Sequence, residues 1–304
     1  MNYDIITIGS ANIDVFLKTK TEVRKHLHHI DLCYRVGEKL LVNDIHFKTG
    51  GGGTNTAVAF SRLGLKTGFI GVLGKDDHAK IILDDLKKEK IKFLGKIKQG
   101  ETGYAVILNE PLERTILVYK GVNNNLEWSD IPAFKAKWLY LTTILGKGQR
   151  TLEKIAFKAK KSGVKIALNT SMYLAKQGLP KLSHFLNNVD VLVLNKEEAL
   201  ALARLKDIKS ATEKIQSHLS PQGIIVVTDS FRPVNAYDGK QYYIKKFARI
   251  KPHNTTGAGD AFASGFIYGI IKQKSIPNSL ELGHKESASV LMHLGAKDGL
   301  LKKL

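Results

Sequence analysis

The sequence is poor in cysteine, in long apolar runs and in acidic residues relative to basic ones. Its 304 residues include a single cysteine, Cys33, which excludes an intrachain disulfide and a metal cluster built from cysteines. We expect Cys33 to be buried as a small apolar side chain. No stretch reaches the roughly 18 uncharged apolar residues of a membrane span. Residues 1–10 are too short, and at Asp4 too acidic, for a signal peptide, so we expect a cytoplasmic protein.

Basic residues outnumber acidic ones, with 47 Lys and Arg against 28 Asp and Glu and a formal net charge of +19. This excess raises the hypothesis of nucleic-acid binding, because Lys and Arg neutralise phosphates. The lysines are nevertheless spread over many expected helix faces, as in 158–161, and lack the interleaved aromatic residues of a single-strand platform. We therefore expect a solvated surface and do not favour a nucleic-acid partner, with attraction of anionic ligands or polymers as the alternative.

Strand-like apolar runs alternate with helix-like periods along most of the chain. This order predicts one α/β domain over 1–304, with a mostly parallel central sheet and helices on both faces. The first helix should begin at Thr54 or Asn55 and stop at Gly64, and Asp76 or Asp77 should cap a second helix that runs through Lys88. Buried strands are predicted over 5–8, 69–73, 138–141, 164–168, 189–194 and 224–228.

Two stretches, 15–48 and 101–120, contain strand-like runs without a helix pattern between them. In the second stretch, 104–108 and 114–119 are predicted to form a hairpin. We expect both stretches to form a small β-sheet that projects from the α/β core as a lid and excludes water from a site beneath it. Exposed sheet edges of this kind also favour a homodimer formed through the lid.

The strongest local signal is the segment 256–262, Thr-Gly-Ala-Gly-Asp-Ala-Phe, which precedes an apolar stretch with helical character. Gly257 and Gly259, with Ala258 between them, allow backbone amides to approach an anion at a partly positive helix N-terminus. Asp260, in the first turn, is placed to accept the proton of an attacking hydroxyl. The alternative is an acid that only complements the helix dipole, and spacing alone leaves both interpretations open.

Two further polar motifs lie next to predicted elements. Gly50 and Gly51 open a run of four glycines before Asn55, where the backbone can approach a polyhydroxylated ligand closely. The alternative is a flexible loop with a helix cap. Asn12 and Asp14 follow the first strand, where open α/β sheets place ligands, so Asp14 is predicted either to bind two sugar hydroxyls or to be a turn carboxylate.

Together, the motifs at 12–14, 50–55 and 255–260 resemble the ribokinase-like (PfkB) family of carbohydrate and nucleoside kinases over nearly the whole chain. The Asn-x-x-Glu motif at 195–198, after a predicted strand, is similar to a fourth motif of that family. The resemblance implies a ribokinase-like fold with a β-sheet lid. It also implies a kinase that uses ATP and Mg²⁺ to phosphorylate a sugar, sugar phosphate or nucleoside. A catalytically silent sugar or nucleoside sensor on the same fold is the alternative.

The resemblance implies a role for each matching residue. Asp260 is the expected catalytic base. The expected anion hole consists of Gly257, Ala258 and Gly259. The residues expected to bind the acceptor are Asn12, Asp14, Gly50, Gly51 and Asn55. The residues expected on the nucleotide side are Asn195, Thr228, His284 and Glu198, the last of which would hold Mg²⁺ through water. For His284, the alternative is a surface histidine at the start of a helix.

The chain also departs from the family pattern. Asn254 stands where many members have the Asp that binds a stimulating monovalent cation, which puts that cation in doubt. Ser230 and Pro233 replace two glycines that usually follow the nucleotide-contacting threonine, so the resemblance does not define the shape of this loop. No acid occurs between Ile131 and Leu152, where ribokinase places one against its sugar, and this absence argues against ribose as the acceptor.

Overall fold

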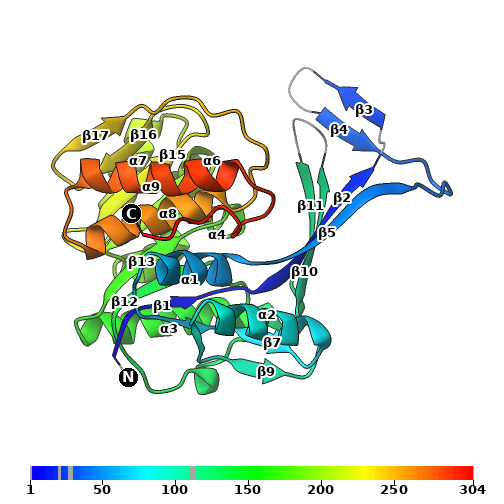
Figure 1. Cartoon of the computed structure of the whole chain (residues 1–304). Coiled ribbons are helices and arrows are strands. Elements are labelled where there is room, and N and C mark those ends of the chain that lie inside the picture. The colour runs from blue at the N-terminus through cyan, green and yellow to red at the C-terminus, as the bar shows by residue number, and fades with distance from the viewer. Residues whose placement is uncertain (1, 20–21, 27–29, 110–113, 304) are drawn as a thin grey trace.

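The computed structural model describes residues 2–19, 22–26, 30–109 and 114–303. Figure 1 shows an α/β body from which a second, narrower sheet projects. The body is built on a nine-stranded sheet within these residues. In spatial order its strands are β17 (Tyr242–Lys245), β16 (Val234–Tyr237), β15 (Ile224–Thr228), β14 (Val191–Asn195), β13 (Lys165–Asn169), β12 (Lys135–Thr142), β1 (Asn2–Ile8), β6 (Thr67–Ile70) and β8 (Lys92–Phe93).

The central strands of this sheet run parallel and are buried on both faces. In β12, Leu139 and Leu141 pack into one hydrophobic cluster, whereas Tyr140 between them packs into the cluster on the opposite face. Burial on both faces explains why such strands are nearly continuous apolar runs in the sequence. At one edge, β16 and β17 add an antiparallel extension. The predicted mostly parallel sheet is therefore confirmed.

Helices cover both faces of the sheet, as predicted. On one face, Leu152, Leu182 and Ile215 bury helices α3, α5 and α7, and on the other Phe60 and Phe266 bury α1 and α8. Full burial of a side chain such as Phe266 contributes roughly 1.5–3 kcal/mol. The helices are α1 (Gly52–Arg62), α2 (Asp77–Lys88), α3 (Lys147–Lys161), α4 (Met172–Ala175), α5 (Leu179–Leu186), α6 (Lys196–Ala203), α7 (Ile208–Gln216), α8 (Ala258–Ile271) and α9 (Ile276–Leu291), with 3₁₀ turns η1 (Gly121–Asn125) and η2 (Trp128–Asp130).

The projecting sheet contains the predicted lid segments. Its strands lie in the order β11 (Arg114–Tyr119), β10 (Gly103–Asn109), β2 (Asn12–Thr19) and β5 (Val42–Gly50), and β10 and β11 form the predicted hairpin. Most of the predicted hairpin loop, 110–113, lies outside the described residues. The lid strands extend beyond the predicted bounds, because β2 begins at Asn12 and β5 continues to Gly50.

A separate small hairpin, β3 (Glu22–Lys25) with β4 (Ile30–Cys33), joins β2 to β5 and carries the cysteine. The expectation that Cys33 is buried was wrong, since its side chain is only half-buried. A two-stranded hairpin has no core of its own in which to bury a side chain.

The predicted first helix begins earlier than expected, at Gly52 instead of Thr54 or Asn55. Gly51 has φ +92°, a conformation that glycine adopts readily, and it turns the chain directly from β5 into α1. A Cβ on Gly53 would lie 2.8 Å from the backbone carbon of Gly9, so the missing side chain lets α1 lie against the end of β1. The alternative of a flexible loop with a helix cap was therefore wrong, because the glycine run passes from β5 directly into α1.

Around α2, the sequence expectations were met in part. Asp76 caps α2 by accepting from the Ala79 amide, and the helix ends at Lys88, as predicted. The predicted strand 69–73 is divided at Gly71 into β6 and β7 (Val72–Gly74), and β7 pairs with β9 (Lys96–Lys98) in a sheet of its own.

Among the residues that the structure describes, no helix has both the length and the apolar character needed to cross a bilayer.

Candidate active site

The anion-hole segment and the glycine turn before α1 meet at one point of the structure. The Asn55 side-chain amide donates a hydrogen bond of 2.8 Å to Oδ2 of Asp260, across 205 positions of sequence. The two residues lie in the first turns of α1 and α8, which pack against each other. Two of the predicted motifs therefore form a single site.

The start of α8 has the form expected of an anion hole. Gly257 is the helix N-cap, with φ +80°, and a Cβ at this position would overlap Ala296. At Gly259, nothing lies within 4 Å of the position that a Cβ would take, so this side of the helix start is open. The first amides of a helix have no partner within the helix. Gly257 and Gly259 thus present backbone N–H groups at the positive end of the helix dipole, next to the Ala258 N–H, which donates to the Thr255 carbonyl oxygen at 3.4 Å.

Asn254 shapes the segment that leads into this helix. Its buried side chain accepts a hydrogen bond of 2.8 Å from the Thr256 amide through Oδ1. Such a turn satisfies a backbone donor just before the anion hole. The carboxylate of an Asp at this position could accept the same bond. The Asn254 side chain therefore preserves the local structure without the negative charge of an Asp.

The predicted acceptor residues line the base of the lid. Asn12, Asp14 and Asn55 are all less than 10% exposed, at 8%, 7% and 6%. A Cβ on Gly50 would overlap the Asp14 carboxylate, and a Cβ on Gly51 would lie 2.6 Å from the Ser10 carbonyl oxygen. The two glycines are therefore required by close packing, and they bring Asp14 against the turn into α1.

The electrostatic environments of the two carboxylates differ. Burial raises the pKa of Asp14 to about 6, an effect that Lys297 opposes and the negative charge of Asp260 reinforces. Burial also raises the pKa of Asp260, while the hydrogen bond from the Asn55 amide lowers it. A raised pKa makes Asp260 a stronger proton acceptor, which is the property that a general base requires.

Asn195 and Thr228, predicted on the nucleotide side, are register partners at the ends of β14 and β15. Ser230, two residues further, has φ +46°, a backbone conformation in which glycine is less strained. The serine therefore retains a conformation of the kind that a glycine would adopt there. Its neighbour Asp229 pairs with Lys196 at 3.2 Å, which ties this loop to the start of α6.

The Asn-x-x-Glu motif forms a capping box at the start of α6. Oδ1 of Asn195 accepts from the Glu198 amide at 2.8 Å, and Oε2 of Glu198 accepts from the Asn195 amide at 3.0 Å. The Thr170 hydroxyl donates to the same carboxylate oxygen at 3.4 Å. Sequence analysis missed this structural role, although the spacing of an Asn and a Glu before an apolar run is its signal.

The donor set around Glu198 fits a hydrated Mg²⁺ better than a direct metal cage. Within the described residues, no cluster of three or more His, Cys, Asp or Glu side chains could hold a metal. Glu198 is 8% exposed, and one of its oxygens is occupied by the capping bonds. A single carboxylate with one oxygen available suits Mg²⁺ that keeps several waters and takes its remaining ligands from phosphates.

His284 lies in the middle of α9. The alternative of a surface histidine at a helix start was therefore wrong in both respects, because the side chain is half-buried and stacks on Phe247 at 3.9 Å between ring centroids. Burial lowers the pKa of His284, so the ring is neutral at neutral pH. No hydrogen bond joins it to Asn195 or Thr228 in the part of the chain that the structure describes. The structure thus places it beside an aromatic ring, and its role in nucleotide binding stays a prediction.

The sequence profile of the pfkB family of carbohydrate kinases matches residues 3–303. The chain belongs to this family. Ribokinase from Haemophilus influenzae is 27% identical over 311 residues, which cover 99% of this chain and 96% of the relative. A 5-dehydro-2-deoxygluconokinase from Clostridium botulinum is 29% identical over 266 residues, 80% of this chain and 78% of the relative. The prediction that this pfkB-family chain is a carbohydrate or nucleoside kinase is confirmed.

Solved structures confirm the fold. Ribokinase from Giardia lamblia superposes with a TM-score of 0.84 at 20% identity, covering 98% of this chain and 97% of that one. An adenosine kinase from Sinorhizobium meliloti superposes with a TM-score of 0.83, also at 20% identity, covering 97% and 95%. The pfkB-family kinase described here therefore has the predicted ribokinase-like fold.

Sequence analysis overlooked Asn123, in η1, which supports the predicted acceptor residue Asn12 of this kinase. Its side chain exchanges hydrogen bonds with the backbone of Ala11 at 2.9 and 3.0 Å and donates to Oδ1 of Asn12 at 2.9 Å. A Cβ on Gly103 would overlap both amide side chains. The run Asn123 to Asn125 is the only local hint in the sequence, and it indicates a turn rather than a site.

Proposed function

We propose that this kinase transfers the γ-phosphoryl group of ATP to a hydroxyl of a sugar, sugar phosphate or nucleoside, with Asp260 as the catalytic base. The observation that carries the proposal is the hydrogen bond between Asn55 and Asp260. It joins the predicted acceptor site to the helix start that would receive the phosphoryl group. Proximity of this kind is a major source of catalysis in phosphoryl transfer.

The proposed proton transfer follows from the hydrogen bonds of Asp260. Its Oδ2 is occupied by the Asn55 amide, and its Oδ1 has no partner among the described residues. The free oxygen would accept the proton of the acceptor hydroxyl while the Asn55 amide holds the carboxylate in place. The amides of Gly257, Ala258 and Gly259 would stabilise the negative charge that develops on the phosphoryl oxygens.

On the nucleotide side, Asn195 and Thr228 would contact the phosphates from two adjacent strand ends, with His284 next to the base. Glu198 would hold Mg²⁺ through water. When bound, Mg²⁺ would supply positive charge that offsets the phosphate oxygens. Asn254 provides no charged ligand for a monovalent cation, so we expect K⁺ to stimulate the enzyme little.

Unpaired polar atoms support a polyhydroxylated acceptor. Oδ1 of Asn55 and Oγ1 of Thr142 are buried and lack a hydrogen-bond partner within the described residues. The carbonyl-type oxygen of Asn55 can only accept a hydrogen bond. A hydroxyl of the acceptor would satisfy it, which offsets the cost of about 1–3 kcal/mol of leaving a buried polar group unpaired.

An ADP-release assay over a panel of sugars, sugar phosphates and nucleosides, with and without K⁺, tests the function. We expect turnover with at least one acceptor class in the presence of Mg²⁺. Ligand binding without turnover for every member of the panel would instead support the catalytically silent sensor.

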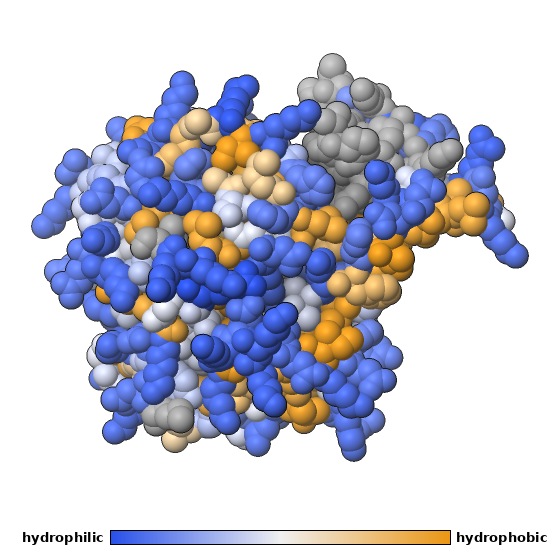
Figure 2. All heavy atoms as spheres, in the orientation of Figure 1, coloured by the Kyte–Doolittle hydropathy of each residue, from blue (hydrophilic) through white to orange (hydrophobic). Residues whose placement is uncertain are grey.

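The lid also supports a homodimer. Leu117, Val106, Val15 and Phe47 form one row across its four strands, and Leu117 and Phe47 are 57% and 60% exposed. Figure 2 shows apolar side chains exposed along this side of the molecule. Apolar groups on an exposed sheet are commonly covered by a partner.

We expect light scattering after size exclusion to give twice the chain mass for the wild type. Phe47→Glu should shift the protein to the monomer, whereas Phe157→Glu, at a 50% exposed site on α3, should not. A wild-type monomer at micromolar concentration would contradict the homodimer.

A further inference from the structure

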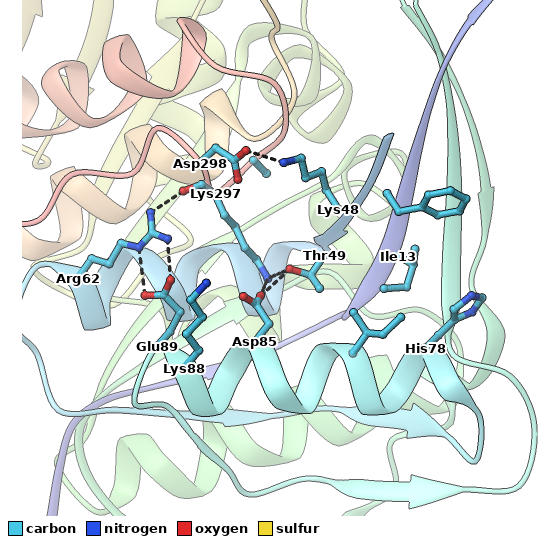
Figure 3. Close-up of a pocket in the computed structure, with 13 residues that line it drawn as sticks. Ile13, Lys48, Thr49, Arg62, His78, Asp85, Lys88, Glu89, Lys297 and Asp298 are labelled. Atoms are coloured by element: carbon cyan, nitrogen blue, oxygen red, sulfur yellow. Dashed lines mark hydrogen bonds and ion pairs between the residues drawn. The ribbon is translucent and has the colours of Figure 1, made fainter. Parts of the chain in front are cut away.

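A cavity of about 440 Å³ lies between α2, the end of β5 and the segment that follows α9 (Figure 3). Lys297 enters it from that segment and is only 6% exposed. Its ammonium donates hydrogen bonds of 2.9 Å to Oγ1 of Thr49 and of 2.9 Å to Oδ2 of Asp85. Thr49 closes the triangle by donating to the same Asp85 oxygen at 2.5 Å.

This triangle connects elements that the proposed reaction uses. Thr49 directly precedes Gly50, whose missing side chain leaves room for the Asp14 carboxylate. Ala296 directly precedes Lys297 and packs against Gly257 at the start of the anion hole. A single buried lysine therefore joins the strand that ends in the acceptor site to the segment that supports the anion hole.

Asp14 lies in the electrostatic field of this lysine. Its carboxylate has no hydrogen-bond partner among the described residues, and it is influenced by Lys297 and, with opposite sign, by Asp260 of α8. From β5, Lys48 is its register partner, but Lys48 is paired with Asp298 at 2.8 Å. From β10, the facing residues Gly103 and Ala105 carry no charge, and α2 contributes Asp85, which is bonded to Lys297.

We propose that Lys297 is a positioning residue for the acceptor: its buried charge keeps Asp14 ionised, and its hydrogen bonds to Thr49 and Asp85 fix the end of β5 against α2. The inference rests on the proposed function, because it takes Asp14 as an acceptor ligand. An ionised carboxylate can accept hydrogen bonds from two sugar hydroxyls, whereas the protonated form has lost part of that capacity.

The sign of the pH dependence follows from the environment of Asp14. Its pKa of about 6 lies above the ordinary value of 3.8 because of burial, so acceptor affinity should fall as the pH decreases through 6. Lys297 lowers this pKa. Removal of the lysine charge should therefore move the loss of affinity to higher pH, by about one pH unit or more.

The direct test is a ¹³C NMR titration of carboxyl-labelled aspartate, with the Asp14 signal assigned from Asp14→Asn. We expect a midpoint near 6 for the wild type and a midpoint higher by about one unit in Lys297→Met. Lys297→Arg should titrate like the wild type. Lys88→Met is the matched control, because Lys88 is an exposed cation on the wall of the same cavity.

An unchanged Asp14 midpoint in Lys297→Met would overturn the inference, as would an equal shift in Lys88→Met. If Lys297→Met does not fold, the double variant Lys297→Met, Asp85→Leu removes both charges of the pair, and it should show the same shift. Replacement of a buried ion pair by apolar residues is often tolerated.

The kinetic readout separates this inference from the proposed function. With an acceptor that the wild type phosphorylates, Lys297→Met should raise the acceptor KM roughly threefold at pH 6.5, with kcat at saturating acceptor and the ATP KM nearly unchanged. An equal KM at pH 6.5 would contradict the role of Lys297. If the wild type phosphorylates no acceptor, the proposed function fails, while the NMR titration still decides whether Lys297 controls Asp14.

Discussion

The proposed acceptor half and the proposed nucleotide half of the site are held together in different ways. In the acceptor half, Asn55 and Asp260 are bonded across 205 positions of sequence, and Lys297 bonds to Thr49 across 248. In the nucleotide half, Asn195 and Glu198 are bonded to each other three positions apart. The acceptor motifs are thus connected by hydrogen bonds between elements that are distant in the sequence. The nucleotide motif is instead held by hydrogen bonds within one helix start.

This difference leads to different expectations for substitutions. A change in the acceptor half should disturb two elements at once and affect chemistry or acceptor binding strongly. A change in the nucleotide half should remove one contact and leave the fold and the acceptor site unchanged. Substitutions in the two halves test this contrast.

The largest effect is expected for Asp260→Asn, which changes the residue that is hydrogen-bonded to Asn55. Loss of the base should lower kcat by roughly 10²–10⁴-fold. Affinity for ATP, measured by calorimetry, should change little because the anion-hole amides remain. Asp298→Asn, which changes a half-exposed acid outside the proposed chemistry, is the control. Turnover of Asp260→Asn within a few-fold of the wild type would show that the carboxylate is not the base.

A smaller effect is expected for Gly50→Ala, because the new Cβ would overlap the Asp14 carboxylate. Displacement of Asp14 should raise the acceptor KM roughly tenfold or more, with an unchanged ATP KM. Gly52→Ala is the comparison in the same glycine run: its Cβ would lie 3.3 Å from the Thr142 side chain, without overlap, so the acceptor KM should rise less than in Gly50→Ala. Equal acceptor KM values for the two variants would remove the packing argument for Gly50.

The smallest effect is expected for Glu198→Gln in the nucleotide half. The amide oxygen can still accept the capping bond from Asn195, so thermal stability should be retained. The loss of charge should raise the Mg²⁺ concentration needed for half-maximal rate by about tenfold. Glu197→Gln changes the exposed neighbouring acid and should behave like the wild type. An unaltered Mg²⁺ dependence would remove Glu198 from the proposed metal site.

The sequence predicted those features that depend on local pattern. Buried parallel strands are continuous apolar runs, as over 224–228, and the cap of α2 at Asp76 follows from a side chain that bonds three residues ahead. The motif at 256–262 is likewise local, since the helix start and its glycines are adjacent in sequence. These features were predicted with nearly correct bounds.

The features that could not be predicted depend on contacts between distant parts of the chain. The early start of α1 depends on the close approach of Gly53 to Gly9, which no local pattern reveals. Lys297 is one of 47 basic residues, and only the fold distinguishes it from the solvated ones. The support of Asn12 by Asn123 similarly depends on the packing of η1 against β2 and the start of the lid.

The most direct test of the central claim is ³¹P NMR of the reaction with ATP, Mg²⁺ and the acceptor selected by the panel. Transfer to a hydroxyl predicts one phosphomonoester resonance for each ADP formed by the wild type. It predicts almost no phosphomonoester with Asp260→Asn at equal enzyme concentration. ADP accompanied only by inorganic phosphate would contradict phosphoryl transfer to a hydroxyl. Equal phosphomonoester yields from both proteins would contradict the role of Asp260 as the base.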